Sequence, residues 1–112
     1  MSPITTHVLD TALGHPAEGV PITLLRIGGG EAAEIGSGAT NEDGRLADLL
    51  EEGALTTGEY LMRFDTGAYF NKLGREAFYP QVEVRFVITD AHAHYHVPLL
   101  LSPYGYSTYR GS

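Results

Sequence analysis

The sequence predicts an all-β fold, an antiparallel sandwich of two sheets that carries one short helix. Short runs rich in β-branched and aromatic residues recur along the chain, and groups of Gly, Pro, Asn and Asp separate them. This is the pattern of strands joined by turns. The chain contains 14 Gly and 6 Pro among its 112 residues, a content that suits many turns better than a helical bundle. Strands at this spacing are typical of a β-sandwich or a β-barrel, and we expect the sandwich.

Seven segments have the length and composition of strands. The alternation of apolar and charged side chains is clearest in Val82-Glu83-Val84-Arg85-Phe86, which predicts one face toward the core and one toward solvent. Three consecutive glycines at 28–30 indicate a hairpin loop, because they lack the spacing of a dinucleotide-binding motif. In chain order, the expected strands are residues 5–10, 20–27, 34–40, 58–64, 82–89, 94–101 and 104–109.

One helix is expected between the fourth and fifth of these strands. It falls within residues 66–76, which contain several apolar side chains. Asp65 or Thr66 is suited to cap its beginning, and Gly74 is suited to end it.

A second segment has weaker helical spacing. Leu46, Leu49 and Leu50 could form one apolar face, but the stretch is short, so a turn and a marginal helix both remain open there. The chain has no linker, internal repeat or low-complexity tract. We therefore expect residues 1–112 to form a single domain.

Composition and charge exclude several classes of protein. Hydrophobic residues make up 43% of the chain and charged residues 19%, which excludes a disordered or collagen-like chain. The formal net charge of −7 argues against nucleic acid and anionic membranes as partners. The absence of Cys excludes disulfides, thiolate metal sites and cysteine nucleophiles. Residues 1–7 lack the pattern of a signal peptide, and the longest apolar run, residues 97–101, is too short to span a bilayer, so we expect a cytoplasmic protein.

Three histidines alternate in the segment His92-Ala93-His94-Tyr95-His96. On a strand, alternate residues share a face, so all three imidazoles would point the same way. Such a group could bind zinc together with a water molecule, or it could supply a metal-free catalytic base. The alternative is that His92 lies in a turn after Asp90 and that the other histidines face solvent.

His7 and Arg45 are further polar candidates. His7 lies in a strand-like segment, where alternation places it on the face opposite Val8; such a histidine is more often a hydrogen-bonded structural residue than a ligand. Arg45 follows the strong turn signal Asn41-Glu42-Asp43-Gly44, which would leave its side chain projecting from a sharp reversal. Taken alone, Arg45 is best interpreted as a solvated arginine paired with Glu42 or Asp43.

Three blocks of the sequence match a known pattern. The first contains His7-Val8-Leu9-Asp10, followed by Gly14 and Pro16-Ala17, and the second is Thr40-Asn41-Glu42-Asp43-Gly44-Arg45. The third block, residues 94–112, reads HYHVPLLLSPYGYSTYRGS. Together they resemble the 5-hydroxyisourate hydrolase family, the transthyretin-like enzymes of purine catabolism, whose signature is the final Tyr-Arg-Gly-Ser. The resemblance runs from His7 to the last residue without a departure at a motif position.

The resemblance implies a transthyretin-like β-sandwich that assembles as a homotetramer, a dimer of dimers, with active sites at the interface between dimers. It implies hydrolysis of 5-hydroxyisourate, the product of urate oxidase, to 2-oxo-4-hydroxy-4-carboxy-5-ureidoimidazoline, without a cofactor or a metal. By matching position, the catalytic or substrate-contacting residues would be His7, Arg45 and His96. Tyr109 and Ser112 would line the same site, with His94 and Arg110 beside it, while His92 lies outside the motif.

The implied chemistry is consistent with these residue types. Opening a cyclic amide needs an activated water, a stabilised oxyanion and a proton for the leaving nitrogen. An imidazole with a pKa of about 6.5 is a natural base at neutral pH, so one of His7 and His96 would activate water and the other would orient substrate or donate the proton. Arg45 offers a planar fork of donors to an electron-rich ring and to the oxyanion.

A binding protein is the competing interpretation. Transthyretin shares the implied fold and carries small hydrophobic ligands without catalysis. It lacks a histidine at the position of His96 and lacks the Tyr-Arg-Gly-Ser ending, whereas this chain has both. These two features favour the enzyme.

Overall fold

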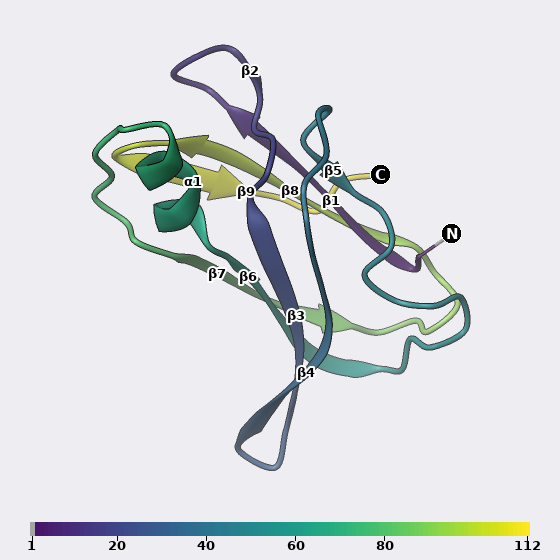
Figure 1. Cartoon of the computed structure of the whole chain (residues 1–112). Coiled ribbons are helices and arrows are strands. Elements are labelled where there is room, and N and C mark those ends of the chain that lie inside the picture. Colours follow the sequence, from purple (N-terminus) through teal and green to yellow (C-terminus); the bar gives the residue numbers. More distant parts are fainter. Residues whose placement is uncertain (1) are drawn as a thin grey trace.

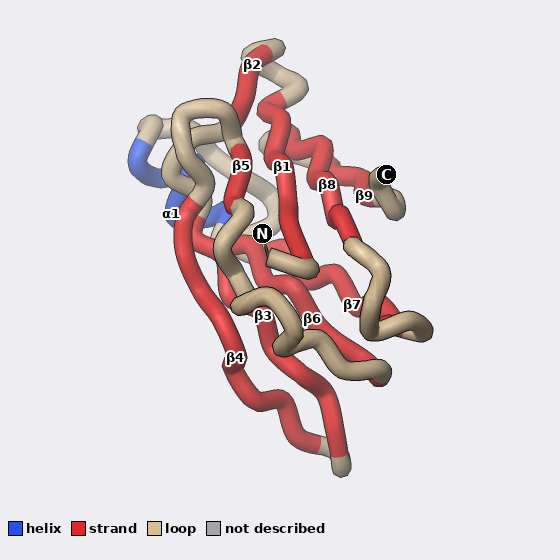
Figure 2. The backbone as a smooth tube through the Cα atoms, turned by 90° about the vertical axis from the view of Figure 1, so that its right-hand side faces the viewer, coloured by secondary structure: helices blue, strands red, loops and turns tan. Residues whose placement is uncertain are grey.

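Two β-sheets lie face to face in the computed structural model, which describes residues 2–112. The two layers are seen edge-on in Figure 2. One sheet has the strand order β2 (His15–Pro16), β1 (Ile4–Asp10), β8 (Tyr95–Ser102) and β9 (Gly105–Thr108), and β5 (Arg45–Leu46) also pairs with β1. The other has the order β4 (Glu31–Ala39), β3 (Pro21–Gly28), β6 (Gly58–Phe64) and β7 (Val82–Ile88). The short helix α1 (Thr66–Lys72) lies at one end of the sandwich (Figure 1).

Alternation along the strands builds the core. Every second side chain of a strand points to the same face, and the inward positions of β1, β6 and β8 carry large apolar groups. Val8, Met62, Phe64 and Leu99 are fully buried between the sheets. The side chains between them point outward, so one face of each sheet is free for polar groups. The predicted two-sheet sandwich with one short helix is confirmed.

One strand pair differs from the antiparallel arrangement of all the others. β1 and β8 run parallel, with Thr5 opposite His96 and His7 opposite Pro98. Parallel strands need a long connection, and here nearly the whole chain separates the two. This pairing brings the first histidine motif beside the last one, which no local sequence pattern predicts.

The structure defines three segments more closely than the sequence does. His15 lies in the two-residue strand β2, where it pairs with Asp10. The segment 46–50 is not helical, because Leu46 belongs to β5 and the residues after it form an irregular stretch. The helix spans Thr66–Lys72 and ends just before Gly74, as expected.

The ends of α1 follow the expected capping. The Asp65 side chain accepts a hydrogen bond from the Ala68 amide, 3.1 Å away, which is the usual N-cap contact. Gly74, just past the helix, has a left-handed φ of 66°, as is typical of a residue that ends a helix.

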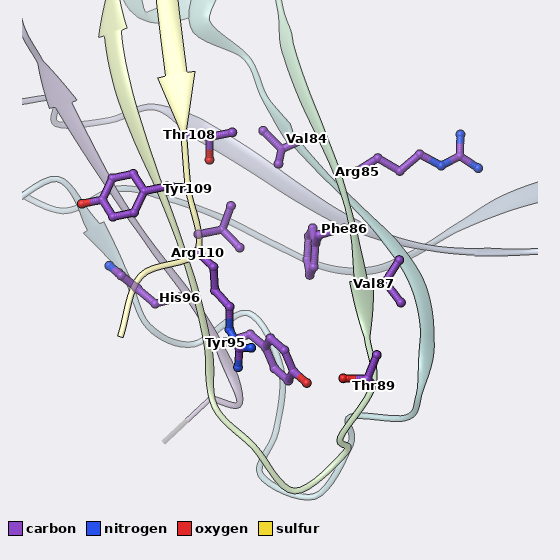
Figure 3. Close-up of a pocket in the computed structure, with 11 residues that line it drawn as sticks. Val84, Arg85, Phe86, Val87, Thr89, Tyr95, His96, Thr108, Tyr109 and Arg110 are labelled. Atoms are coloured by element: carbon purple, nitrogen blue, oxygen red, sulfur yellow. The ribbon is translucent and has the colours of Figure 1, made fainter.

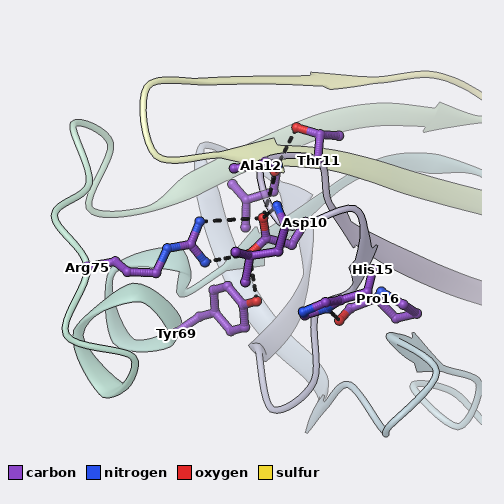
Figure 4. A network of polar contacts seen from close by, with 9 residues as sticks. Asp10, Thr11, Ala12, His15, Pro16, Tyr69 and Arg75 are labelled. Atoms are coloured by element: carbon purple, nitrogen blue, oxygen red, sulfur yellow. Dashed lines mark hydrogen bonds and ion pairs between the residues drawn. The ribbon is translucent and has the colours of Figure 1, made fainter.

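A buried carboxylate ties the end of β1 to the helix region (Figure 4). Asp10 has no exposed surface, and its Oδ2 atom accepts hydrogen bonds from the Tyr69 hydroxyl at 2.8 Å and from Arg75 Nη1 at 2.6 Å. The amides of Ala12 and Leu13 also donate to this carboxylate. Burial alone would raise the pKa of Asp10, but the hydrogen bonds from Arg75, Tyr69 and Leu13 outweigh burial and hold the pKa below its ordinary value of 3.8. A carboxylate satisfied in this way stabilises the fold only while it is ionised.

Replacing Asp10 by Asn is expected to lower the free energy of unfolding by about 3 kcal/mol, because Arg75 loses its buried partner. The contribution of Asp10 is complete above pH 3.8 and is lost as the pH falls from there through its lowered folded-state pKa. Urea unfolding as a function of pH measures both effects. Glu83→Gln, which breaks the exposed pair with Arg63, serves as the control and should cost less than about 1 kcal/mol. Equal losses for the two variants would show that the Asp10 network is not a main support of the fold.

Candidate active site

Polar side chains gather on the outward face of the sheet that contains β1 and β8. His7 lies on β1, where its backbone pairs with Arg45 of β5 on one side and with Pro98 of β8 on the other. It is half-buried, whereas Val8, the next residue, faces the core. The alternation predicted for His7 is confirmed.

Arg45 is positioned by a tight turn. The Asn41 side-chain oxygen accepts hydrogen bonds from the amides of Asp43 and Arg45, at 2.9 and 3.0 Å. Gly44 has a φ of 73°, and its carbonyl accepts a 2.7 Å hydrogen bond from the Val8 amide, which fixes the turn against β1. None of the ion pairs found among residues 2–112 involves Arg45. The expected pairing of Arg45 with Glu42 or Asp43 is therefore wrong, and its guanidinium is exposed and available to a ligand.

His96 is held by contacts from two directions. Thr5, directly opposite it on β1, places its hydroxyl oxygen 2.8 Å from His96 Nδ1 and 3.2 Å from His94 Nε2. On the other side, the C-terminal segment runs antiparallel beside β8, and the Gly111 amide donates a 2.8 Å hydrogen bond to the His96 carbonyl. The Thr5 contact therefore holds the imidazole, and the Gly111 contact holds the backbone of the same residue.

Gly111 is required by this close approach. A Cβ atom at this position would lie 2.6 Å from Cδ2 of the His96 ring. This distance is too short for two non-bonded carbon atoms, so either the ring or the segment would have to move. Because Gly111 has no side chain, the C-terminal segment can lie against the imidazole ring of His96. Ser112, the next residue, thereby reaches the site. Glycine in the Tyr-Arg-Gly-Ser ending thus has a steric explanation.

The site is a hollow with a volume of about 250 Å³, large enough for a small heterocycle. Four predicted site residues line it: Arg45, His94, His96 and Ser112. Thr5, Thr6 and Ala47 complete the wall. His7 lies beside the hollow rather than in its wall, on the same sheet face and close enough to His96 to influence its charge.

Electrostatics favour the neutral form of His96. Burial, followed by the positive charge of Arg45 and the neighbouring rings of His7 and His94, lowers the pKa of His96 below 6.5. A hydrogen bond with the Thr5 backbone acts in the opposite direction and does not overcome these effects. At neutral pH the ring is uncharged, which is the form that can take a proton from water.

Tyr109 and Arg110 lie at a different opening (Figure 3). With His96, they line a second cavity of about 330 Å³ between the edges of the two sheets. The Arg110 guanidinium lies over the Tyr95 ring, 4.4 Å from its centroid, which anchors the segment by a cation–π contact. His96 and the exposed ring of Tyr109 project to one side of this segment and Phe86 lies on the other. In the single chain, Tyr109 does not reach the hollow that contains Arg45.

The shared face considered for His92, His94 and His96 does not form, and the alternative, with His92 in a turn after Asp90, is confirmed. β8 begins at Tyr95, and His92 lies in a turn, where its amide donates a 2.9 Å hydrogen bond to the Asp90 side chain. In the part of the chain that the structure describes, no three His, Asp or Glu side chains are arranged to hold a metal ion. No helix there is long and apolar enough to cross a membrane.

Thr5 is a site residue that the sequence interpretation missed. It lies two positions before His7 and therefore on the same face of β1, which is the one local signal that pointed to it. Its two imidazole partners lie 89 and 91 residues away in the chain, so only the parallel pairing of β1 with β8 reveals its contacts.

Fold and site together define a β-sandwich protein with a small polar pocket, built from histidine and arginine on the outer face of one sheet. The family model described as "HIUase/Transthyretin family" matches residues 4–111. The chain belongs to this family.

Proteins named 5-hydroxyisourate hydrolase and proteins named transthyretin are both similar to this chain. It is 55% identical to "5-hydroxyisourate hydrolase 2" of Rhizobium meliloti (strain 1021), over 97% of this chain and 95% of the relative. The structure of Klebsiella pneumoniae 5-hydroxyisourate hydrolase is 40% identical, with a TM-score of 0.88 and full coverage of both chains. Transthyretin from Sparus aurata is 32% identical, with a TM-score of 0.93 over 99% of this chain and 97% of that one. Backbone shape therefore does not distinguish the hydrolases from the transthyretins, and the function has to be argued from the residues of the site.

Proposed function

We propose that this chain hydrolyses 5-hydroxyisourate to 2-oxo-4-hydroxy-4-carboxy-5-ureidoimidazoline in urate degradation. The observation that carries the proposal is the hollow in which Arg45, His96 and Ser112 meet beside His7. Relatives at 55% and 49% identity, from Rhizobium meliloti and Mus musculus, bear the name 5-hydroxyisourate hydrolase. Arg45, His94, His96 and Ser112, which line the hollow, fall in the sequence blocks that resemble that family.

His96 is the general base in the proposed reaction. As its ring takes a proton from water, the water oxygen attacks the carbonyl carbon of the six-membered ring and the carbonyl oxygen becomes an oxyanion. When this intermediate collapses, the ring C–N bond breaks, and the nitrogen leaves with a proton supplied by a second imidazole, that of His7. The lowered pKa of His96 supports its assignment as base, because burial and Arg45 keep it neutral at neutral pH.

Arg45 binds the electron-rich ring of the substrate and stabilises the oxyanion. Its guanidinium is always charged and presents donors in one plane. Because it forms no ion pair among residues 2–112, no contact with a carboxylate has to be broken before it engages the substrate. Ser112 and Tyr109 would complete the substrate contacts. None of these steps requires a cofactor.

The assembly we propose is a homotetramer that encloses these sites. β7 and β9 each form one edge of their sheet, and Val87 and Tyr106 on them are 63% and 43% exposed. Free edges of this kind can pair with a second copy of the chain. A second dimer packed on the outer face of the β1–β8 sheet would cover the hollow and bring Tyr109 of a neighbouring copy toward it. Light scattering should report a tetramer, and an active monomer would contradict sites at a dimer interface.

The experiment that tests the proposed reaction generates 5-hydroxyisourate from urate with urate oxidase and follows its loss by ultraviolet absorbance. Addition of the protein should make the decay faster than the spontaneous rate, in proportion to the protein concentration. The competing function, binding of a small hydrophobic ligand as in transthyretin, rests on the TM-score of 0.93 to the Sparus aurata protein. A decay that stays at the spontaneous rate would reject the hydrolase and favour the binding protein.

Gly111→Ala is expected to lower kcat on the order of tenfold to hundredfold, because the new Cβ displaces either the His96 ring or the segment that carries Ser112. Gly105→Ala is the matched control: the nearest atom to its new Cβ is Ser102 Oγ at 3.8 Å, an ordinary contact. The assay described above measures both variants. If Gly111→Ala is as active as the control, the close approach to His96 has no part in catalysis.

A further inference from the structure

A single hydroxyl lies between two histidine rings. Thr5 Oγ1 is 2.8 Å from Nδ1 of His96 and 3.2 Å from Nε2 of His94. Thr5 is only 8% exposed, and its β-branched side chain has restricted χ1 freedom. The hydroxyl oxygen is therefore fixed where water competes little for its hydrogen bonds.

The number of hydrogens available at this contact limits how its hydrogen bonds can be directed. A threonine hydroxyl has one hydrogen to donate, and a neutral imidazole has one N–H and one bare nitrogen. If both contacts are hydrogen bonds between neutral rings, Thr5 donates to at most one ring. When it donates to one, the other ring must donate to it. The tautomers of His94 and His96 are thereby coupled, because a bare nitrogen facing Thr5 on one ring requires an N–H facing it on the other.

Of the two arrangements in which Thr5 donates its hydrogen to a ring, only one suits a base at His96. The contact with Thr5 uses Nδ1 of His96, so Nε2 is the nitrogen left for water. For Nε2 to accept a proton, Nδ1 must carry the hydrogen and donate it to Thr5. Thr5 then donates its own hydrogen to Nε2 of His94, whose exposed ring can keep its N–H on Nδ1, facing solvent.

We propose that Thr5 is a positioning residue that holds the His96 proton on Nδ1 and thereby presents a bare Nε2 to the substrate water, with His94 as the acceptor that fixes the direction of the Thr5 hydroxyl. This inference rests on the proposed function, in which His96 is the base. It gives His94 a role in the site without direct contact with the reacting atoms. If His94 did not accept, the Thr5 hydrogen would be free to point at His96 Nδ1, and the proton would move to Nε2.

The charged groups around His96 are consistent with this arrangement. Arg45 of β5 and His7 of β1 face the ring, and His94 precedes it on the chain. None of them is a carboxylate that could replace Thr5 as acceptor for Nδ1–H. Contact with the Thr5 backbone raises the pKa of His96, but not enough to outweigh burial and these neighbouring groups.

The first test is independent of activity. Nitrogen-15 NMR of histidine side chains at neutral pH distinguishes N–H nitrogens from bare ones. In the wild-type protein, His96 should carry its hydrogen on Nδ1, and His94 should show a bare Nε2. A hydrogen on Nε2 of His96 in the wild type would overturn the proposal even if the protein hydrolyses 5-hydroxyisourate. Conversely, the tautomer can be read in a protein that proves inactive, so the two failures are distinguishable.

The second test compares Thr5→Val with Thr5→Ser. Valine keeps the shape without the hydroxyl and should lower kcat on the order of tenfold to hundredfold, as when the hydrogen-bonding partner of a functional imidazole is removed. The KM should change little, and the NMR signals should show His96 gaining the Nε2–H form. Serine restores the hydroxyl and should recover most of the rate. Unchanged tautomer and kcat in Thr5→Val would refute the positioning role.

Discussion

Replacing His96 by Asn is expected to lower kcat for 5-hydroxyisourate by at least about a hundredfold, because the variant loses the imidazole that takes the proton from water in the proposed reaction. Asn is polar and similar in reach to the near side of imidazole, so it can keep a contact with Thr5 but cannot act as a base. The ring is partly buried on a strand whose core-facing neighbours are unchanged, so the variant should remain folded. Ring-opening rates and circular dichroism measure the two effects.

The matched control for this variant is His92→Asn. His92 is an exposed histidine four residues away, in a turn that its backbone amide rather than its ring helps to form. It should keep the wild-type rate. If His96→Asn is also fully active while folded, His96 is not the base and the proposed mechanism fails.

The second large effect is expected for Arg45→Gln. Loss of the guanidinium should lower kcat on the order of a hundredfold, the usual cost of removing one donor to an oxyanion. It should also change the pH profile. Arg45 helps to lower the pKa of His96, so its removal raises that pKa. Because the active form of the base is neutral, the acidic limb of kcat/KM should move to higher pH.

Arg63→Gln is the control for Arg45, because Arg63 is an exposed arginine paired with Glu83 on the other sheet. It should leave both the rate and the pH profile unchanged. An acidic limb that does not move in Arg45→Gln would mean that the limb reports a group other than His96. A rate that does not fall would mean that Arg45 does not contact the oxyanion.

Much of the fold was predictable because alternation is a local property. The apolar positions of Val82–Ile88 and the outward position of His7 follow from a two-residue period, whichever strands lie beside them. The two-residue strands β2 and β5 were not predictable from propensity, since their structure depends on pairing with β1. The parallel pairing of β1 with β8 depends on the packing of the whole chain.

The histidine segment shows the limit of a periodic pattern. Alternation from His92 to His96 predicts one shared face only if the strand begins at His92, but β8 begins at Tyr95. The Asp90 side chain holds the preceding residues in a turn by accepting the His92 amide. His94 and His96 still meet, because both reach the Thr5 hydroxyl from β1. That Thr5 lies between the two rings follows from the parallel pairing of β1 with β8 and from no local pattern in the sequence.

The most direct test of the proposed activity measures the loss of 5-hydroxyisourate, formed in place by urate oxidase, with wild-type protein, His96→Asn and His92→Asn at equal concentration. The wild type and His92→Asn should accelerate the decay equally, in proportion to protein, and His96→Asn should leave it near the spontaneous rate. A decay at the spontaneous rate with all three proteins, or equal acceleration by all three, would contradict a hydrolase whose base is His96.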